Sequence, residues 1–176
     1  MATTAELSIK TAIAKAVDPI EAITLEYGQP DVHLDLSVEE TSPWVPWTPG
    51  TYLKHIMFDV RNNVWHQILR VDPGAKLGKH RHRGPVTGVV LEGGWKYAEY
   101  DWHANKGDII RESPGVIHEL LGDPGGMTTF FTVAASLDFF DENENLTETW
   151  DVFSYIHHYV SYCQANGIPI NKALFL

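Results

Sequence analysis

The sequence predicts an all-β fold, a single antiparallel barrel or jelly roll with an N-terminal extension and a C-terminal helix. Many short β-rich runs follow one another in the middle of the chain, turn residues separate them at regular spacing, and a helical period appears only near the end. A length of 176 residues suits one domain with its own core. We expect an extension over residues 1–50 that packs on a barrel over 51–140, followed by an acidic loop and helix over 141–176.

The N-terminal extension contains two different patterns. Residues 4–17 show a weak helical period, which Asp18-Pro19 ends. Residues 40–50 carry three prolines and two tryptophans, a composition that favours an extended lead-in whose aromatic rings pack on the barrel.

The barrel region is predicted from alternating β-rich runs and turn signals. Its expected strands are Tyr52–Val60, Asn63–Val71, Val86–Leu91, Trp95–Trp102, Asp108–Glu112 and Met127–Ala135. Turn signals between them are Arg61-Asn62-Asn63, Asp72-Pro73-Gly74, Glu92-Gly93-Gly94, Asn105-Lys106-Gly107-Asp108 and Asp123-Pro124-Gly125-Gly126.

After the barrel, Asp141 to Asn145 predicts an acidic turn, and residues from about 151 to 165 predict a helix. Apolar residues recur there at helical spacing, and Asn166-Gly167 supplies the stop. Cys163 lies within this helical pattern and is the only cysteine, so an intrachain disulfide is impossible and a structural role is expected.

Three histidines predict a metal site. Side chains at i and i+2 of a strand point to the same face, roughly 6.5 to 7 Å apart, so His80 and His82 can converge on one ion while Arg81 points away. His118, from a separate predicted strand, supplies the third imidazole. Imidazole is a good ligand for iron, zinc, copper or nickel.

The residues around these histidines resemble the two motifs of the cupin superfamily. The first block has Gly74, His80, His82, Thr87 and Gly94 at the motif spacing, but Thr87 stands where that family usually has a ligating glutamate. The second block runs from Gly107 to His118, with one residue of spacing changed before Pro114 and with Gly122 in place of an asparagine. The resemblance implies a cupin jelly roll with His80, His82 and His118 as metal ligands.

Loss of the motif glutamate changes the expected chemistry. Three neutral imidazoles leave the charge of a divalent ion uncompensated, so the site should favour an anionic ligand that chelates through two oxygens, such as an enolate. A coordination position would remain for dioxygen or water.

A narrower resemblance covers residues 80–97 with Glu99 and Asp101-Trp102, Arg111 to Gly115, and Asp151-Val152-Phe153. These residues are similar to the 2,4'-dihydroxyacetophenone dioxygenase branch of cupins. That similarity implies a non-haem Fe(II) dioxygenase that uses O2 to cleave a carbon–carbon bond next to a carbonyl, in an aryl α-hydroxyketone or a β-diketone.

Glu112 lies six residues before His118, where the three-histidine dioxygenases have a carboxylate, and it is the candidate catalytic residue. It could orient a ligating imidazole, bond a coordinated water or bind the metal weakly. The alternative is a rim salt bridge to Arg111 or Arg83. For Glu99 we expect an outward, solvated side chain.

Other residues have simpler expected roles. The cluster of Lys76, Lys79, Arg81 and Arg83 could steer an anion, although a solvated loop that offsets nearby carboxylates is expected. Surface or packing roles are expected for the six other histidines, at positions 33, 55, 66, 103, 157 and 158. Core packing explains most of the aromatic residues, with a few expected to touch substrate: Trp65, Trp95, Tyr97, Tyr100, Trp102, Phe130 and Phe131.

Composition limits the classes of partner that we expect the protein to bind. A formal net charge of −10 without long Lys/Arg blocks argues against nucleic acid, and no run is long enough to span a bilayer. We therefore expect a cytoplasmic homo-oligomer, a dimer or higher, that acts on a small ketone with O2 and Fe(II). The alternative is a zinc- or nickel-bearing cupin that senses or binds without redox chemistry, like the module of zinc-dependent anti-sigma factors. Such modules normally adjoin a helical domain, for which this chain has little room. A metal-free ligand-binding barrel is the third possibility.

Overall fold

Antiparallel strands dominate the computed structural model, which describes residues 18, 27 and 31–176. The chain divides into two units, Met1–His33 and Leu34–Leu176, and the strands belong to the second. The helical period expected over residues 4–17 lies outside the described residues.

The strands run in chain order and are followed by two helical segments. They are β1 (Val45–Pro46), β2 (Thr51–Asp59), β3 (Val64–Val71), β4 (Lys76–His82), β5 (Val86–Tyr97), β6 (Ala104–Asn105), β7 (Ile109–Glu112), β8 (Ile117–Ala134), β9 (Ser136–Phe140) and β10 (Leu146–Asp151). Helix α3 spans Val152–Asn166 and a short 3-10 helix spans Lys172–Leu174.

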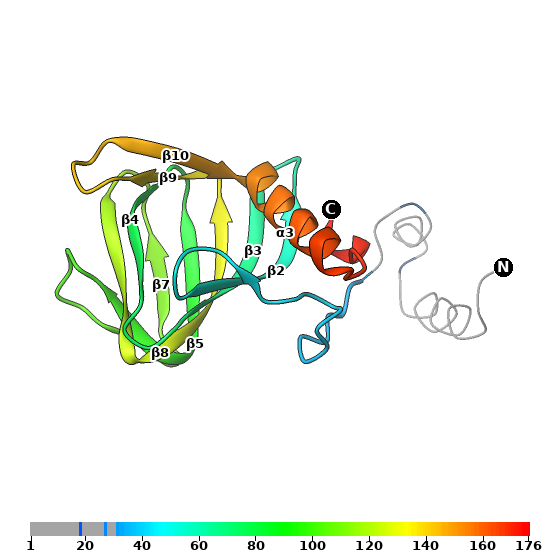
Figure 1. Cartoon of the computed structure of the whole chain (residues 1–176), viewed down its shortest axis with the longest axis horizontal. Helices are drawn as coiled ribbons and strands as arrows, with labels where there is room; N and C mark the ends of the chain where they lie inside the picture. Colours follow the sequence, from blue (N-terminus) through cyan, green and yellow to red (C-terminus); the bar gives the residue numbers. More distant parts are fainter. Residues whose placement is uncertain (1–17, 19–26, 28–30) are drawn as a thin grey trace. The chain divides into compact units, whose positions relative to one another are not determined.

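One antiparallel sheet contains the ten described strands in the order β1-β2-β3-β8-β4-β9-β10, with β5 paired to β8, β7 and β6. The sheet curls on itself, as Figure 1 shows, and encloses an apolar core. The all-β prediction is therefore confirmed. Strand β8 is central to the arrangement because it pairs with β3, β4 and β5.

Two predicted turns proved wrong, because long strands pass through them. Residues 92–94 lie inside β5, and residues 123–126 lie inside β8. The pairing of β5 with β8 shifts register between Val90 and Glu92 and again between Gly93 and Trp95. Gly93 has a φ of 65°, a left-handed conformation that glycine adopts at little cost, so its turn-like signal marks an irregular strand rather than a break.

The register shifts in β5 also decide which side chains enter the barrel. Val86, Gly88 and Val90 are buried in the first half of the strand, whereas Trp95 and Tyr97 are buried in the second half. The buried positions change from even to odd numbers, as expected when extra residues interrupt a period of two. Trp95 and Tyr97 therefore face the interior.

Beyond the barrel, the predicted helix is confirmed and two strands before it were missed. Asp151 caps α3 by accepting a hydrogen bond from the Ser154 amide at 3.0 Å, and Gly167 ends the helix with a φ of 66°. Strands β9 and β10 surround the predicted acidic turn. Cys163 is buried in the helix, in agreement with a structural role.

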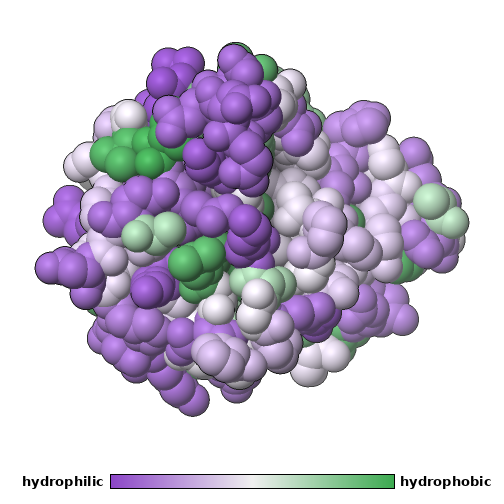
Figure 2. Space-filling view, turned by 60° about the vertical axis from the view of Figure 1, so that its left-hand side comes forward, coloured by the Kyte–Doolittle hydropathy of each residue, from purple (hydrophilic) through white to green (hydrophobic). Residues whose placement is uncertain are grey.

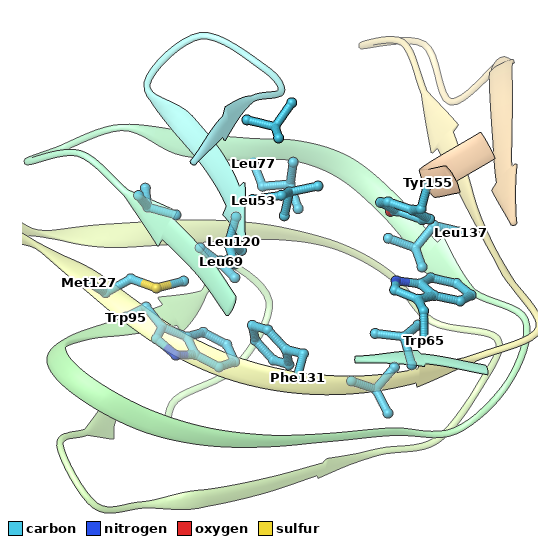
Figure 3. Packing of buried hydrophobic residues seen from close by; sticks show 14 of the residues in the cluster. Leu53, Trp65, Leu69, Leu77, Trp95, Leu120, Met127, Phe131, Leu137 and Tyr155 are labelled. Atoms are coloured by element: carbon cyan, nitrogen blue, oxygen red, sulfur yellow. The ribbon is translucent and has the colours of Figure 1, made fainter. Parts of the chain in front are cut away.

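The core fills the space between the curled sheet and α3. In Figure 3, Leu53 from β2, Leu69 from β3, and Leu120 and Phe131 from the two halves of β8 project into one interior. Trp47, from the proline-rich lead-in, packs edge-on against Phe139 with ring centroids 5.5 Å apart, so the expected packing of that segment on the barrel is confirmed.

The surface differs sharply from this interior. On the face shown in Figure 2, hydrophilic side chains predominate and hydrophobic ones form small separate groups. Among the described residues, no helix has the length and apolar character needed to cross a membrane.

Candidate metal centre

The three predicted histidines meet inside the barrel. Along β4 the burial alternates so that His80 and His82 point inward, and Arg81 lies between them on the other face. On the neighbouring strand β8, His118 is the direct register partner of His80. Directly opposed residues of antiparallel strands have Cβ atoms about 4.5 to 5.5 Å apart, so this pairing fixes the two imidazoles side by side.

The geometry of the three rings suits one ion. Their candidate ligand atoms all lie within 4.8 Å of one another, and the ring centroids are 4.6 to 5.3 Å apart. Metal–nitrogen bonds of about 2.0 to 2.1 Å place two neighbouring ligand nitrogens roughly 3 to 3.5 Å apart. Small side-chain rotations are enough to reach that spacing.

The hydrogen bonds of the imidazoles leave nitrogens free for a metal. His80 places Nδ1 2.8 Å from the Gly78 carbonyl oxygen, so Nδ1 carries the proton and Nε2 keeps its lone pair. Apart from the Glu112 carboxylate, whose Oε2 lies 3.3 Å from His82 Nε2 and 3.7 Å from His118 Nε2, no described residue offers a partner to a ring nitrogen of His82 or His118. Buried nitrogens without partners are costly, and coordination of an ion would satisfy them. The residues therefore fit a bound metal.

Burial also keeps two of these rings, His80 and His118, unprotonated. Desolvation, followed by the neighbouring His82 and His118, lowers the pKa of His80 well below its usual value. Burial lowers the pKa of His118 to about 4, although the Glu112 carboxylate acts in the opposite direction. Neutral imidazole is the form that binds metals, so at neutral pH no proton competes for these nitrogens.

Glu112, at the end of β7, stands beside the histidines. Its Oε2 lies 3.3 Å from His82 Nε2 and 3.7 Å from His118 Nε2, and its side chain is only 6 % exposed. Burial alone raises the pKa of this carboxyl, but hydrogen bonding and charge from His82, together with Tyr97, lower it overall. A carboxylate is thus held next to the candidate ligands, and the expected alternative of a salt bridge to Arg111 or Arg83 is absent from the described contacts.

Thr87, which stands at the motif position of the missing glutamate, is exposed on the outside of β5. Its neighbour Val86 is the residue that faces the interior, and Val86 is the register partner of Glu112 on β7. A carboxylate is therefore present beside the histidines, but it comes from the adjacent strand.

Tyr97 connects Glu112 with His118. Its hydroxyl donates a hydrogen bond to Glu112 Oε2 at 2.8 Å, while its ring stacks on His118 with centroids 3.7 Å apart and planes 7° apart. Burial, followed by the nearby Glu112 carboxylate, raises the pKa of Tyr97 well above its usual value, so the phenol remains a donor.

A small cavity adjoins these groups. About 30 Å³ of it can hold the centres of water-sized molecules, and its polar wall is formed by His80, His82, Glu112, Tyr97 and Gln67. The remaining wall is apolar. Of the aromatic residues considered from the sequence, Tyr97 and Phe131 reach this cavity, and Trp47 joins them from the lead-in.

The basic cluster is offset by carboxylates. Lys76 binds Glu119 at 2.7 Å, and Lys79 lies 3.8 Å from Glu144. Arg81 and Arg83 both donate to Asp138, at 2.7 and 2.6 Å. These contacts support a charge-compensating role over steering, and they confirm that Arg81 points away from the histidines.

Other expectations from the sequence are met in part. Glu99 is exposed, as expected, and accepts a hydrogen bond from the Glu119 amide. The remaining described histidines lie apart from the centre, but His55 and His158 form a pair that their sequence separation conceals, with 3.3 Å between Nε2 and Nδ1. Gln67 was missed, although Trp65, Gln67 and Leu69 alternate on β3 and a polar residue in a buried apolar face is itself a signal.

The fold and the centre together define a class: all-β barrel proteins whose interior carries three histidines able to hold a metal ion. A profile of the ChrR Cupin-like domain matches residues 35–138, more than half of the chain. The chain therefore belongs to the ChrR Cupin-like domain family, and its barrel is a cupin.

Solved structures agree with this assignment. An RmlC-like cupin protein from Ralstonia eutropha is 25 % identical over 84 % of this chain and 96 % of its own, with a TM-score of 0.77. An acetylacetone dioxygenase from Acinetobacter johnsonii is 16 % identical over 76 % of this chain and 93 % of its own, with a TM-score of 0.68, which shows a shared fold. No curated protein sequence matches the chain significantly.

Proposed function

We propose that the protein is a non-haem Fe(II) dioxygenase that cleaves a carbon–carbon bond next to a carbonyl group of a small ketone. The observation that carries the proposal is the buried set of three converging imidazoles with a carboxylate beside them. The shared fold adds support, since the acetylacetone dioxygenase of A. johnsonii is an enzyme of this reaction type built on such a barrel.

In this proposal His80, His82 and His118 hold the iron. The cavity beside these three residues would receive a substrate that chelates through two oxygens. Bound iron would supply the redox chemistry with O2 and act as a Lewis acid toward the carbonyl oxygens. The apolar cavity wall excludes bulk water from this chemistry.

Glu112 is the group in position to move a proton. Its Oε2 is held by the Tyr97 hydroxyl, whereas its Oε1 is buried without a hydrogen-bond partner among the described residues. Conversion of a ketone to its enolate requires a base, and Glu112 Oε1 is the atom that would accept the proton from the ligand. The Tyr97 hydrogen bond fixes the carboxylate for that step.

Cavity size bears on the substrate. The cavity is small, with about 30 Å³ for the centres of water-sized molecules, so we expect a small ketone to enter more readily than a bulky aryl ketone. Acetylacetone is thus the first compound to test, with 2,4'-dihydroxyacetophenone as the larger comparison.

The test combines metal analysis with oxygen consumption. The purified protein, reconstituted with Fe(II) under reducing conditions, should hold about one iron per chain and consume O2 with one of these ketones, forming a carboxylic acid as one of the two cleavage products. Glu112→Gln should lower turnover by about 10- to 100-fold with a smaller loss of iron. A fully iron-loaded protein that consumes no O2 across a panel of diketones and hydroxyketones would overturn the proposal.

A second candidate function follows from the family itself. Its description names ChrR, and zinc accepts three histidines without taking part in redox chemistry. A zinc- or nickel-bearing cupin with a binding or sensing role would retain stoichiometric zinc or nickel in preference to iron. It would show no O2 uptake even when iron-replete.

A further inference from the structure

Gln67 is a polar residue on an otherwise apolar stripe of the barrel. It lies on β3 between Trp65 and Leu69, which share its inward face, and it is only 4 % exposed. Its Oε1 has no hydrogen-bond partner among the described residues. An unsatisfied buried carbonyl costs about 1 to 3 kcal/mol, so this amide oxygen calls for a partner that enters from the cavity.

The cavity that Gln67 lines is the one beside the histidines. Its wall includes His80, His82, Glu112 and Gln67, although Gln67 belongs to a strand that carries none of the candidate ligands. In the sheet, β8 lies between β3 and β4. A small molecule that fills this cavity therefore meets the histidines and the Gln67 amide at the same time.

The other polar groups beside the cavity have roles that differ from the one available to Gln67. The three imidazoles offer lone pairs to a metal, and Glu112 offers a carboxylate beside them. Of the other polar lining residues, Tyr97 already donates its hydroxyl to Glu112, and the indole N–H of Trp47 can only donate. The rest of the wall is apolar, from residues such as Leu69, Leu77 and Phe131. Gln67 is the group that can recognise a polar atom of the ligand that neither chelates the metal nor contacts Glu112.

We propose that Gln67 is a specificity-determining residue whose Oε1 accepts a hydrogen bond from an O–H or N–H group of the ligand. This inference rests on the proposed function, since it takes the ligand to be a small oxygen chelator held at the histidine site. The preferred ligand then carries a donor in addition to its two chelating oxygens. A small hydroxylated ketone meets that description, whereas a plain β-diketone such as acetylacetone would bind the same site without this hydrogen bond.

A structural role for the amide makes a different prediction. Gln67 faces His55 across the β2–β3 ladder, and His55 Nδ1 is also buried without a partner among the described residues. If the amide served only to order this part of the core, its replacement would lower thermal stability and leave the choice between ligands unchanged. Ligand discrimination is therefore the informative measurement.

Binding of a matched pair of chelators to the Co(II)-loaded protein tests the proposal without any turnover. Acetohydroxamate and N-methylacetohydroxamate chelate through the same two oxygens, but only the first has an N–H donor. Their dissociation constants can be measured from the visible absorption of Co(II). Wild type should prefer acetohydroxamate by about tenfold more than Gln67→Met does, which corresponds to one hydrogen bond of about 1.4 kcal/mol.

N-methylacetohydroxamate is also larger by one methyl group, which could weaken its binding for steric reasons alone. That steric effect is the same in wild type and in Gln67→Met, so it cancels when the preference of one protein is compared with that of the other. Gln67→Glu keeps an acceptor oxygen and should retain the preference while it weakens both anions. Leu69→Met, a size-neutral change on the same stripe, should shift both constants together. If Gln67→Met does not fold, Gln67→Asn withdraws the amide by one methylene and should lose the same preference.

The possible failures are distinguishable. Equal ratios in wild type and Gln67→Met, with both chelators bound, would overturn the role of Gln67 and leave the metal site intact. Failure of the wild-type protein to bind Co(II) at all would overturn the metal site and the Gln67 proposal with it.

Discussion

At the scale of single residues, the centre depends on where three imidazoles project. His80 and His118 are opposed across β4 and β8, and His82 follows two residues later on the same face. Burial removes these rings from bulk water, so the ring nitrogens that lack a protein partner gain most from coordination. Loss of any one imidazole should therefore weaken metal binding more than it lowers the stability of the fold.

Replacement of His118 by alanine tests this reasoning. The His118→Ala protein should keep its barrel and lose most bound metal and any O2 consumption, because two strand ligands hold an ion far less tightly than three. Metal content per chain and circular dichroism measure the two effects. The matched control is His66→Ala, at a half-buried β3 histidine that packs edge-on against Phe130, and this variant should keep its metal. Full metal occupancy in His118→Ala would remove this residue from the site.

Tyr97 makes two contacts, a hydrogen bond to Glu112 and a ring contact with His118, and two substitutions can separate their effects. Tyr97→Phe removes the hydrogen bond to Glu112 Oε2 but keeps a ring on His118, so turnover should fall about tenfold while metal affinity changes little. Tyr97→Leu removes both contacts and should also weaken metal binding. Kinetics at saturating iron and a metal titration give the two readouts. Equal kinetics in wild type and Tyr97→Phe would show that the hydroxyl does not position Glu112.

At the scale of elements, α3 is attached to the sheet partly through two histidines. His158 places Nε2 2.8 Å from the Pro46 carbonyl oxygen of β1, so that nitrogen donates and Nδ1 accepts from His55 Nε2 on β2. Around His55, the rings of Tyr155 and Tyr159 from the helix and Phe58 from β2 complete a buried aromatic group. This chain of hydrogen bonds requires both imidazoles to be neutral.

Acid should therefore loosen this contact. Burial, followed by the nearby His158, lowers the pKa of His55 to about 3, whereas the unfolded chain has a value near 6.5. Because the unfolded state binds the proton more readily, the stability that neutral His55 provides is fully present above about pH 6.5. It is lost progressively as pH falls toward 3, by at most about 1.4 kcal/mol per pH unit.

Urea unfolding at pH 7, 6 and 5 measures this slope. In His55→Phe, which keeps a ring in the aromatic group, stability should depend less on pH than in wild type. His157→Gln, at an exposed position of the same helix, should keep the wild-type slope. Identical slopes for wild type and His55→Phe would show that His55 does not carry the pH dependence.

Elements that depend on chain neighbours were predicted from the sequence, whereas features that depend on pairing between distant strands were not. A period of two placed His80 and His82 together, and capping residues gave α3, because both depend on neighbours in the chain. The face of Tyr97 depended on register shifts in β5, which arise from pairing with a strand some thirty residues away. Glycine and proline suggested turns at residues 92–94 and 123–126 because the same residues also allow a strand to bulge.

At the scale of the whole molecule, the candidate centre joins segments that are distant in sequence. The histidines come from β4 and β8, Glu112 comes from β7, and Gln67 comes from β3. Motif spacing identified the histidines, yet it placed the expected glutamate position at Thr87, which faces outward. Only the pairing of β5 with β7 shows that a carboxylate reaches the interior from another strand. An ion held by two central strands should stabilise the whole barrel.

Removal of the metal should accordingly lower the thermal stability of the protein. An ion that binds only the folded state at a concentration a thousandfold above its dissociation constant adds about 4 kcal/mol, which for a domain of this size corresponds to a shift of roughly 10 °C. Differential scanning calorimetry of the metal-loaded protein before and after chelation measures the change. His80→Ala should melt near the chelated wild-type temperature and show no response to chelator. A wild-type melting temperature that is unaffected by chelation, in protein shown to contain one metal per chain, would mean that the ion does not join β4 to β8.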